Sequence, residues 1–406
     1  MRQFKLLVRV VSFLVIPFLF LSFNDIENSF TCSFDYSGTN SLFIEYEDDG
    51  ISFNWITNQR DSGYFQLKDK NNALIKEGFT SKSRVHKTII NTKISSRVFF
   101  TFGGKDSKKH TVSLYPNPRL EESNYCDIDS IFVVGDVHGE YDRLVNLLKK
   151  SNIINDNLDW ISGKSHLVFL GDLFDRGNKV TKTLWFIYEL EQQAKRSGGN
   201  IHLVLGNHEI MVMSKDLRYL SRKEKNISLA YKVSYDYLFH PKKTILGNWL
   251  KSKTSVLKLD DILFAHGGVS DLQGKSIKEF NKIASENIDH PAFLDLMKSE
   301  PITGNYTKEE WMQLRLFFYG QNSPYWYRGY VLSDTLRVPL NNILEKYDAK
   351  IHIVGHTPNE TIRKKYRKKL ITTDLTQKAT ELLLLVNKNG RYKTYKFNSK
   401  GQKVRF

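Results

Sequence analysis

The sequence predicts an α/β fold that follows a small all-β domain. In residues 33–118, short stretches rich in β-branched and aromatic residues alternate with turn-forming residues. From residue 128 onward, apolar stretches of strand length alternate with segments whose apolar residues recur at helical spacing. The first pattern is typical of a small β-sandwich, and the second of a sheet covered by helices. A chain of 406 residues also exceeds one typical domain.

The all-β domain is predicted from five candidate strands, residues 42–46, 51–56, 64–67, 97–102 and 111–114. Turn formers such as Asp48-Asp49-Gly50 and Asn71-Asn72 separate these strands. Pro116, Asn117 and Pro118 then mark a linker to the second domain. We therefore expect one domain at 33–118 and another at 128–406.

The α/β domain is predicted from strands at residues 131–134, 166–170, 201–205, 262–265 and 351–354 and a helix at 180–195. The chain ends in a predicted hairpin, with strands 382–386 and 392–397 joined by a turn at 387–390. Long polar insertions between these elements carry helical stretches and many aromatic residues, which we expect to form packing and lid contacts.

Five short motifs each follow one of these strands: Gly135-Asp136-Val137-His138-Gly139, Gly171-Asp172-Leu173-Phe174-Asp175-Arg176-Gly177, Gly206-Asn207-His208-Glu209, His266-Gly267-Gly268 and Gly355-His356-Thr357. α/β sheets place their ligands in the loops at strand ends, so we expect all five loops to face one crevice.

The motifs supply ligands for two divalent metal ions. Asp136 and His138 are two places apart and can converge on one ion, and Asp172 can bridge that ion to a second. Asn207, His266 and His356 would complete the second site. Oxygen and imidazole ligands without thiolate favour manganese, with iron and zinc as alternatives. Such a centre would hold a phosphate dianion and deliver a metal-bridging hydroxide to it directly, without a phosphoenzyme.

Four further residues are candidates for chemistry on phosphate. His208, oriented by Asp175, could donate a proton to the leaving alkoxide, although a hydrogen bond to the backbone would also explain this histidine. Arg176 could hold two phosphate oxygens with its guanidinium group. Arg328, in Trp326-Tyr327-Arg328-Gly329, could do the same or could be a stacked structural arginine.

Together, these motifs resemble the signatures of the calcineurin-like metallophosphoesterases, and more narrowly those of the phosphoprotein phosphatase superfamily. The resemblance covers about Ile131 to Asp374. It implies a four-layer αββα sandwich, an acid pair and a phosphate-binding arginine. It also implies the same residue roles as above: Asp136, His138, Asp172, Asn207, His266 and His356 for metal, His208 and Asp175 for the acid pair, and Arg176 for phosphate.

The sequence differs from the eukaryotic members of this superfamily in two places. Eukaryotic serine/threonine phosphatases usually continue Gly-Asn-His-Glu with Ser-Arg, whereas this chain has Ile210-Met211. This difference and the segment Trp326 to Gly329 are more similar to the Shewanella-like phosphatases and related bacterial enzymes. That branch implies a second phosphate-binding arginine at Arg328, and it leaves open whether phosphoserine, phosphothreonine or phosphotyrosine is the substrate.

The resulting hypothesis is a phosphoric monoester hydrolase that acts on a phosphorylated protein or on a small phosphoester. One alternative is a dinucleoside-polyphosphate hydrolase, whose family usually lacks the aspartate found here at Asp175 and has Asp where this chain has Glu209. A second alternative is a non-catalytic protein that binds phosphate or a partner. The complete ligand set disfavours this second alternative. The β-rich segment lies outside the resemblance, and its partner is unknown.

The N-terminus predicts export. Arg2, Lys5 and Arg9 precede a short apolar run from Val10 to Phe23, as in a signal peptide. No clear cleavage site follows, so residues 1–24 are either a signal peptide or an uncleaved membrane anchor, and the protein is periplasmic, extracellular or anchored facing outward. In an oxidising compartment Cys32 and Cys126 could form a disulfide.

The formal net charge is +16, but the lysines are scattered and no nucleic-acid-binding module is evident, so we expect no nucleic acid partner. The densest basic run, Arg363 to Lys369, is expected to be a solvated face or a rim that attracts phosphorylated substrates.

Overall fold

The structure is a computed structural model that describes residues 34–301 and 305–406. Residues Asp35–Phe406 form one compact unit, so the predicted boundary between residues 33–118 and 128–406 stays a prediction. The N-terminal segment 1–24 and Cys32 lie outside the described residues. Cys126 is exposed, and its disulfide with Cys32 also stays a prediction. Within the described residues, every helix is too short or too polar to cross a membrane.

The N-terminal strands form one antiparallel sheet: β1 (Phe43–Glu47), β2 (Gly50–Lys68), β3 (Leu74–Ile90), β4 (Val98–Gly104) and β5 (His110–Leu114). This differs from the expected two-sheet sandwich. The single long strand β2 covers two predicted strands, with register irregularities between residues 56 and 64. β3 pairs along one edge of β2, while β1 and then β4 pair along the other.

The bend in β2 lets this one sheet form its own core. Phe53, in the first half of β2, stacks on Phe100 of β4 with ring centroids 4.0 Å apart. Trp55 and Phe102 are also fully buried there. Irregular pairing at a β-bulge bends a strand, which is how one sheet buries apolar residues that a sandwich would bury between two sheets.

The remaining strands form two six-stranded mixed sheets. The first has the order β13-β14-β12-β11-β10-β6, and the second has the order β17-β16-β15-β7-β8-β9. The strands are β6 (Asn124–Tyr125), β7 (Ser130–Val134), β8 (His166–Phe169), β9 (Asn200–Leu203), β10 (Val256–Leu259), β11 (Ile262–Ala265), β12 (Ile351–Val354), β13 (Arg363–Lys365), β14 (Leu370–Thr372), β15 (Glu381–Lys388), β16 (Arg391–Asn398) and β17 (Lys403–Arg405). β7, β8 and β9 are parallel, as are β11, β12 and β14. β15 and β16 form the predicted C-terminal hairpin.

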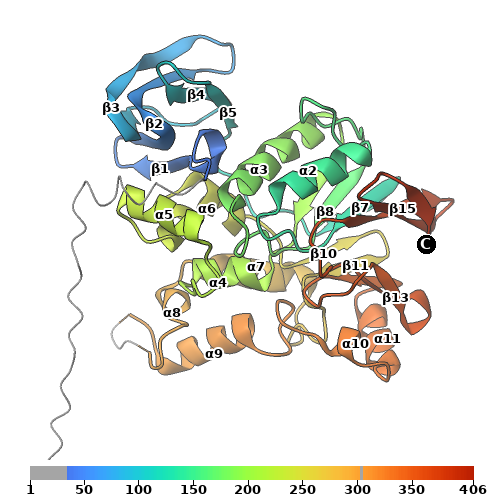
Figure 1. Ribbon diagram of the computed structural model, residues 1–406. Coiled ribbons are helices and arrows are strands. Elements are labelled where there is room, and N and C mark those ends of the chain that lie inside the picture. Colours follow the sequence, from blue (N-terminus) through green and yellow to red (C-terminus); the bar gives the residue numbers. More distant parts are fainter. Residues whose placement is uncertain (1–33, 302–304) are drawn as a thin grey trace, which may run out of the picture. The chain divides into compact units, whose positions relative to one another are not determined.

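The two sheets pack face to face with helices outside them, which confirms the four-layer αββα arrangement (Figure 1). Val133 and Leu383 from one sheet share a buried core with Phe264 and Ile353 from the other. Helices α2 (Tyr141–Lys150) and α3 (Val180–Arg196) lie on one side, and α7 (Ile277–Asn287), α10 (Gly329–Leu332) and α11 (Arg337–Lys346) on the other. The other helices are α4 (Asn207–Met213), α5 (Arg222–Tyr231), α6 (Ile245–Lys251), α8 (Pro291–Leu294) and α9 (Lys308–Tyr319), with short 3₁₀ turns η1 (Gly38–Asn40), η2 (Asp236–Phe239) and η3 (Tyr366–Lys368).

The N-terminal sheet is attached to the α/β layers through α3. The indole Nε1 of Trp185 donates to the carbonyl oxygen of Leu42 at 3.0 Å, in a fully buried contact. On the same helix, Glu189 accepts from the backbone N–H of Ser113 at 2.6 Å. These hydrogen bonds fix β1 and β5 to the helix that covers β9.

A buried ion cluster reinforces the same region. The ammonium group of Lys253, fully buried, lies 2.6 Å from Glu191 Oε2 and also contacts Glu121. The indole of Trp249 donates to Glu191 at 2.8 Å. A buried cation that contacts two carboxylates offsets their cost of desolvation, so the cluster depends on Lys253.

We expect Lys253→Met to lower the free energy of unfolding by about 3–5 kcal/mol, because it leaves two buried carboxylates with one partly exposed partner, Lys195. Urea unfolding followed by circular dichroism measures this change. Lys282→Met is the matched control, since Lys282 is exposed and pairs with exposed Glu286; it should change stability by less than about 0.5 kcal/mol. Equal, small effects of both substitutions would show that the buried cluster does not stabilise the fold.

Candidate metal centre

The five motif loops meet at one edge of the paired sheets. β7, β8 and β9 lead into the first three motifs, while β11 and β12 of the other sheet lead into His266 and His356. Around His266 Nε2, Asn207 Oδ1 lies at 2.9 Å, His356 Nδ1 at 3.1 Å and Asp172 Oδ1 at 3.2 Å. The structure therefore brings together all of these predicted ligands.

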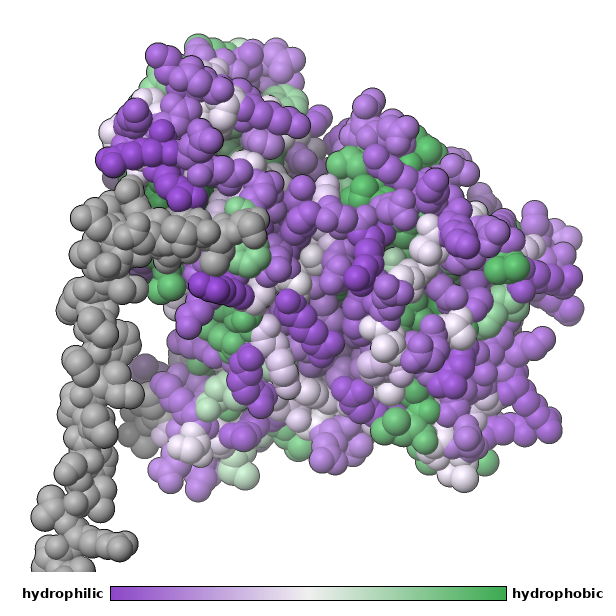
Figure 2. All heavy atoms as spheres, in the orientation of Figure 1, coloured by the Kyte–Doolittle hydropathy of each residue, from purple (hydrophilic) through white to green (hydrophobic). Residues whose placement is uncertain are grey.

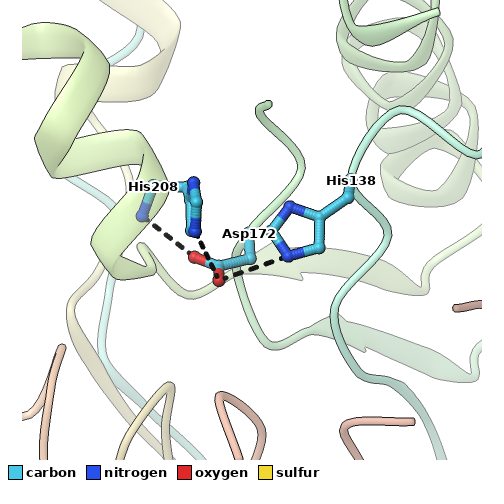
Figure 3. A group of neighbouring side chains, drawn as sticks. All are labelled: His138, Asp172 and His208. Carbon is cyan, nitrogen blue, oxygen red and sulfur yellow. Dashed lines mark hydrogen bonds and ion pairs between the residues drawn. The ribbon is translucent and has the colours of Figure 1, made fainter. Parts of the chain in front are cut away.

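Asp172 lies at the middle of the cluster and divides it into two halves. Its Oδ1 faces His266, while its Oδ2 lies 3.7 Å from His138 Nε2. Figure 3 shows the carboxylate between the rings of His138 and His208. Asp136 Oδ2 lies 4.0 Å from His138 Nε2 and completes this half. One carboxylate thus faces two separate groups of donors with two different oxygens, as a bridging ligand would.

Backbone carbonyl groups set the orientation of two of the imidazoles. Phe174 O lies 2.7 Å from His138 Nδ1, and Leu170 O lies 2.5 Å from His266 Nδ1. In each ring the Nδ1–H donates to the carbonyl, and Nε2 turns toward the cluster. Hydrogen bonds of this kind orient histidine ligands in metalloproteins.

The donor set fits two divalent ions, with Asp136, His138 and Asp172 on one side and Asp172, Asn207, His266 and His356 on the other. Among the residues that the structure describes, buried His138 Nε2 has no hydrogen-bond partner. A Cβ atom at Gly206 would lie 2.4 Å from Asp172 Oδ1, and one at Gly355 would lie 2.7 Å from Asp136 Oδ1. These motif glycines therefore leave the space in which the carboxylates sit.

Several site residues have strained backbones. His138, Asp172, Asp175, Arg176 and His356 have φ between 47° and 66°, the left-handed region that non-glycine residues avoid. Each costs about 1–2 kcal/mol. Strain of this kind persists only where the surroundings hold it in place.

Glu209 provides part of that support, a role that the sequence analysis missed. Its buried carboxylate accepts from the backbone N–H groups of Asp172 (2.8 Å), Leu173 (2.7 Å) and Gly206 (2.7 Å). It therefore ties the second motif loop to the start of α4. A glutamate three residues after a helix N-cap position is a recognisable capping-box signal, so the role at Gly206 was readable from sequence.

Asp374 and Lys378 were also missed. The ammonium group of Lys378 contacts Asp374 Oδ1 and lies 3.7 Å from Asp136 Oδ2. Burial and the nearby Asp136 raise the pKa of Asp374 to about 8. Both residues lie beyond the last motif, so no spacing in the sequence connects them to Asp136.

His208 lies beside the metal ligands with both ring nitrogens engaged. Asp175 Oδ2 is 2.6 Å from Nδ1, and Arg176 Nη2 is 3.4 Å from Nε2. Burial lowers the pKa of His208, but the Asp172 and Asp175 carboxylates outweigh burial and raise it. By distance alone His208 also groups with His138 and Asp172 as a possible metal site. Because Asp175 holds Nδ1, His208 is left out of the ligand set and kept for proton donation.

The two predicted arginines flank the cluster. Arg176 packs against Tyr219, with the guanidinium carbon 5.9 Å from the ring centroid, next to His208. Arg328 donates through Nη1 to the carbonyl oxygen of His356 at 3.0 Å. Arg328 is partly buried, and its Nη1 also lies 3.4 Å from Thr357 Oγ1.

Comparison with known proteins agrees with this geometry. Residues 130–360 match the family described as calcineurin-like phosphoesterase, which is more than half of the chain. The chain belongs to the calcineurin-like phosphoesterase family. The predicted family and its predicted fold are both confirmed, and the protein is a hydrolase.

Individual relatives indicate the part of the calcineurin-like phosphoesterase family to which the chain is similar. The chain is 30% identical over 255 residues to Shewanella-like protein phosphatase 1 of Plasmodium berghei, a match that covers 59% of this chain and 66% of that protein. It is also 32% identical over 139 residues to a symmetrical bis(5'-nucleosyl)-tetraphosphatase of Vibrio cholerae, covering 34% of this chain and 44% of that protein. The chain thus spans less than two thirds of either relative.

A solved structure resembles nearly the whole chain. The cold-active protein-tyrosine phosphatase of a psychrophilic Shewanella species matches with a TM-score of 0.70 and 28% identity, covering 90% of this chain and 98% of that chain. The residues from 130 to the C-terminus make up less than 90% of the chain. The structural likeness therefore extends into the N-terminal β-sheet, beyond the part that the sequence motifs cover.

Metal loading should release protons and depend on pH. Burial lowers the pKa of His266, but Asp172 outweighs burial and raises that pKa to about 9. Below pH 9 a metal ion must therefore displace a proton from His266, and its apparent affinity should rise about tenfold per pH unit from pH 6.5 to 8.5. Titration calorimetry with Mn²⁺ at pH 7, in buffers of different ionisation enthalpy, should show about one proton released per ion at this half-site. A heat that is identical in every buffer would contradict the assignment.

Proposed function

We propose that this metallophosphoesterase hydrolyses phosphate monoesters of proteins, with water as the acceptor. One observation carries the proposal: a buried donor set for two metal ions lies between a His208–Asp175 pair and two arginines. Carboxylates and imidazoles hold the cations, the arginines suit phosphoryl oxygens, and the protonated imidazole suits a leaving alkoxide.

In this proposal the metal ions, the two arginines and the His208–Asp175 pair have separate roles. Two bound divalent ions would supply an acidified water and neutralise charge on the phosphoryl oxygens. Arg176 and Arg328 bind and orient the phosphoryl group from its two sides. Protonated His208 donates from Nε2 to the leaving oxygen, while Asp175 holds Nδ1 and favours the charged ring. The 2.6 Å contact between Asp175 Oδ2 and His208 Nδ1 supports this assignment.

A peptide substrate is favoured by a groove next to the site. A cavity of about 660 Å³ is lined by Trp311, Met312, Leu316 and Tyr319 and has Arg218 and Arg315 at its rim. One chain of ring contacts connects it to the site: Tyr319 stacks on Trp326, whose ring lies 5.9 Å from that of His356. Arg218, also in the lining, lies over the ring of Tyr219, which is 5.3 Å from the ring of His208.

This groove can take the apolar side chains that flank a phosphorylated residue. The likeness to a Shewanella protein-tyrosine phosphatase supports keeping phosphotyrosine among the candidate substrates alongside phosphoserine and phosphothreonine. The match to tetraphosphatases over 34% of the chain is the reason to keep a dinucleoside polyphosphate in any substrate panel.

We also propose that the protein works outside the cytoplasm, as a secreted or outward-facing anchored enzyme. The support is the charged start and apolar run of residues 2–23. Fractionation of cells that express the full chain, together with N-terminal sequencing of the product, would separate cleaved, anchored and cytoplasmic forms.

Substitutions at the site should separate metal binding from proton donation. With p-nitrophenyl phosphate, Asp172→Asn should abolish metal-dependent hydrolysis, because it removes the charge shared by both halves of the centre. His208→Asn should lower kcat about 10²–10⁴-fold for phosphoserine peptides, and less for p-nitrophenol, a leaving group that needs no proton. His240→Asn, a partly exposed histidine outside the site, is the control. Full activity of the Asp172 and His208 variants would refute the mechanism.

The substrate class needs a direct assay. Protein reconstituted with Mn, Zn or Fe should release phosphate from phosphopeptides, and Arg315→Ala should raise KM for peptides without changing turnover of p-nitrophenyl phosphate. Hydrolysis of diadenosine tetraphosphate alone would place the enzyme in nucleotide metabolism. Absence of hydrolysis with every substrate would favour a non-catalytic binding role.

A further inference from the structure

We propose that the face formed by β13, η3, β16 and β17 holds a second anion site, which takes a phosphate group and is separate from the metal centre. This region contains the basic run Arg363 to Lys369, which the catalytic site does not use. Hydrophilic residues dominate this part of the molecule, near the C-terminal strands (Figure 2).

The site is a cavity of about 230 Å³ whose charged side chains are all cationic. It is lined by Ile351, Lys364, Lys368, Ile371, Tyr392, Lys393, Thr394, Arg405 and Phe406. Four of the nine lining residues are thus lysine or arginine, contributed by β13, η3, β16 and β17, and none is acidic. Cations from four separate elements converge on one small cavity.

The cavity lies at the other end of β12 from the metal centre. Ile351, which lines it, begins β12, whereas the metal ligand His356 follows the last residue of that strand, Val354. Four strand residues rise about 3.3 Å each, so more than about 10 Å separates the two sites. A phosphate in this cavity would not reach the metal ligands.

The cationic groups are not neutralised by the carboxylates of this face. Among the described residues, Lys368, Lys393 and Arg405 have no ion-pair partner, and all three are exposed. The nearby acids are already engaged, since Asp334 pairs with Lys365 at 2.9 Å and Glu381 with Lys396 at 3.4 Å.

A third acid, Asp260, lies on the far side of Tyr392. It accepts from the hydroxyl of Tyr392 and from the backbone N–H groups of Asp127 at 2.8 Å and Ile128 at 3.2 Å. Lys364 has a fixed position, because it donates to Thr394 Oγ1 and to Phe406 O, both at 2.6 Å. The carboxylate of Phe406 thus offsets Lys364, and the exposed cations Lys368, Lys393 and Arg405 remain as an excess of positive charge around the cavity.

The turn that presents Lys368 is strained. Tyr366, Arg367 and Lys368 have φ of 49°, 55° and 73°, three successive non-glycine residues in the left-handed region. Non-glycine residues avoid this region, so the surrounding contacts must hold the turn. Lys365 donates to Val331 O at 2.6 Å, and Lys369 donates to Asn341 Oδ1 at 2.8 Å, which anchors the turn on both sides.

These features select phosphate among anions. Three exposed cations match a group with two or more negative charges, and the guanidinium fork of Arg405 suits two phosphoryl oxygens. The volume admits a phosphate or a pyrophosphate but no large ligand. The same chemistry can come from a free phosphate compound or from a phosphorylated lipid headgroup, and the experiment distinguishes these two sources.

Pyrophosphate is the first probe, titrated calorimetrically into the full chain after its metal has been removed on a chelating resin. The Asp172→Asn background further weakens any contribution of the metal centre. We expect one site, weakened at least tenfold by Lys368→Gln with Arg405→Gln. The matched control, Lys76→Gln with Lys225→Gln, removes two exposed lysines elsewhere and should change the affinity less than twofold. Absence of binding, or equal weakening by both pairs, would overturn the proposal.

Flotation with vesicles then identifies the source of the phosphate. Vesicles that contain phosphatidate are compared with vesicles of equal charge that contain phosphatidylserine. Retention on phosphatidate that is lost in the Lys368/Arg405 double variant assigns a lipid headgroup, and pyrophosphate binding without retention assigns a free phosphate compound. Retention without pyrophosphate binding would overturn the site. Because metal-free protein is used, these outcomes do not depend on the proposed phosphatase activity.

Discussion

The position of the Asp172 carboxylate is the constraint on which the site depends. Its two oxygens face different groups of ligands, so a small displacement would break both halves of the centre at once. Its backbone has φ of 52°, and its N–H is held by Glu209 at 2.8 Å. The carboxylate in turn accepts from the backbone N–H of His208 at 3.0 Å, which joins two motif loops. The loops thus hold one another in place.

Electrostatics explains why this arrangement needs cations. Asp136, Asp172 and Asp374 are all buried. The ammonium group of Lys378 contacts Asp374 Oδ1 and lies 3.7 Å from Asp136 Oδ2. Burial lowers the pKa of His138 to about 3, and burial together with the charge on His266 lowers that of His356 to about 2, so both imidazoles are neutral and suited to metal. In the metal-free site these carboxylates lie beside Lys378 and a protonated His266, and a bound divalent ion would replace the proton on His266.

The sequence predicted the α/β layers better than the N-terminal sheet. Strand 262–265 is fully apolar, and strand 351–354 is apolar except for the buried His352, because both faces of these strands are buried; such runs are readable without context. β3 is different. Most of its residues are exposed, and it carries lysines and serines, so its sequence pattern does not predict a strand. Its extended form comes from pairing with β2. Because β2 pairs with β3 along its whole length, the N-terminal strands form one bent sheet and not the expected sandwich.

Motif residues at strand ends determined the chemistry of this protein from sequence alone, because ligand type and short-range spacing are local properties. Their convergence was an expectation that follows from parallel strands ending at one edge. The packing of the two sheets decided the rest: it brought Asp374 and Lys378 to Asp136, and it placed cations of four elements around one cavity far from the metal. Such contacts join residues with no fixed separation along the chain. Only the tertiary structure determines these contacts, because burial of a charge is favourable only when an opposite charge lies beside it.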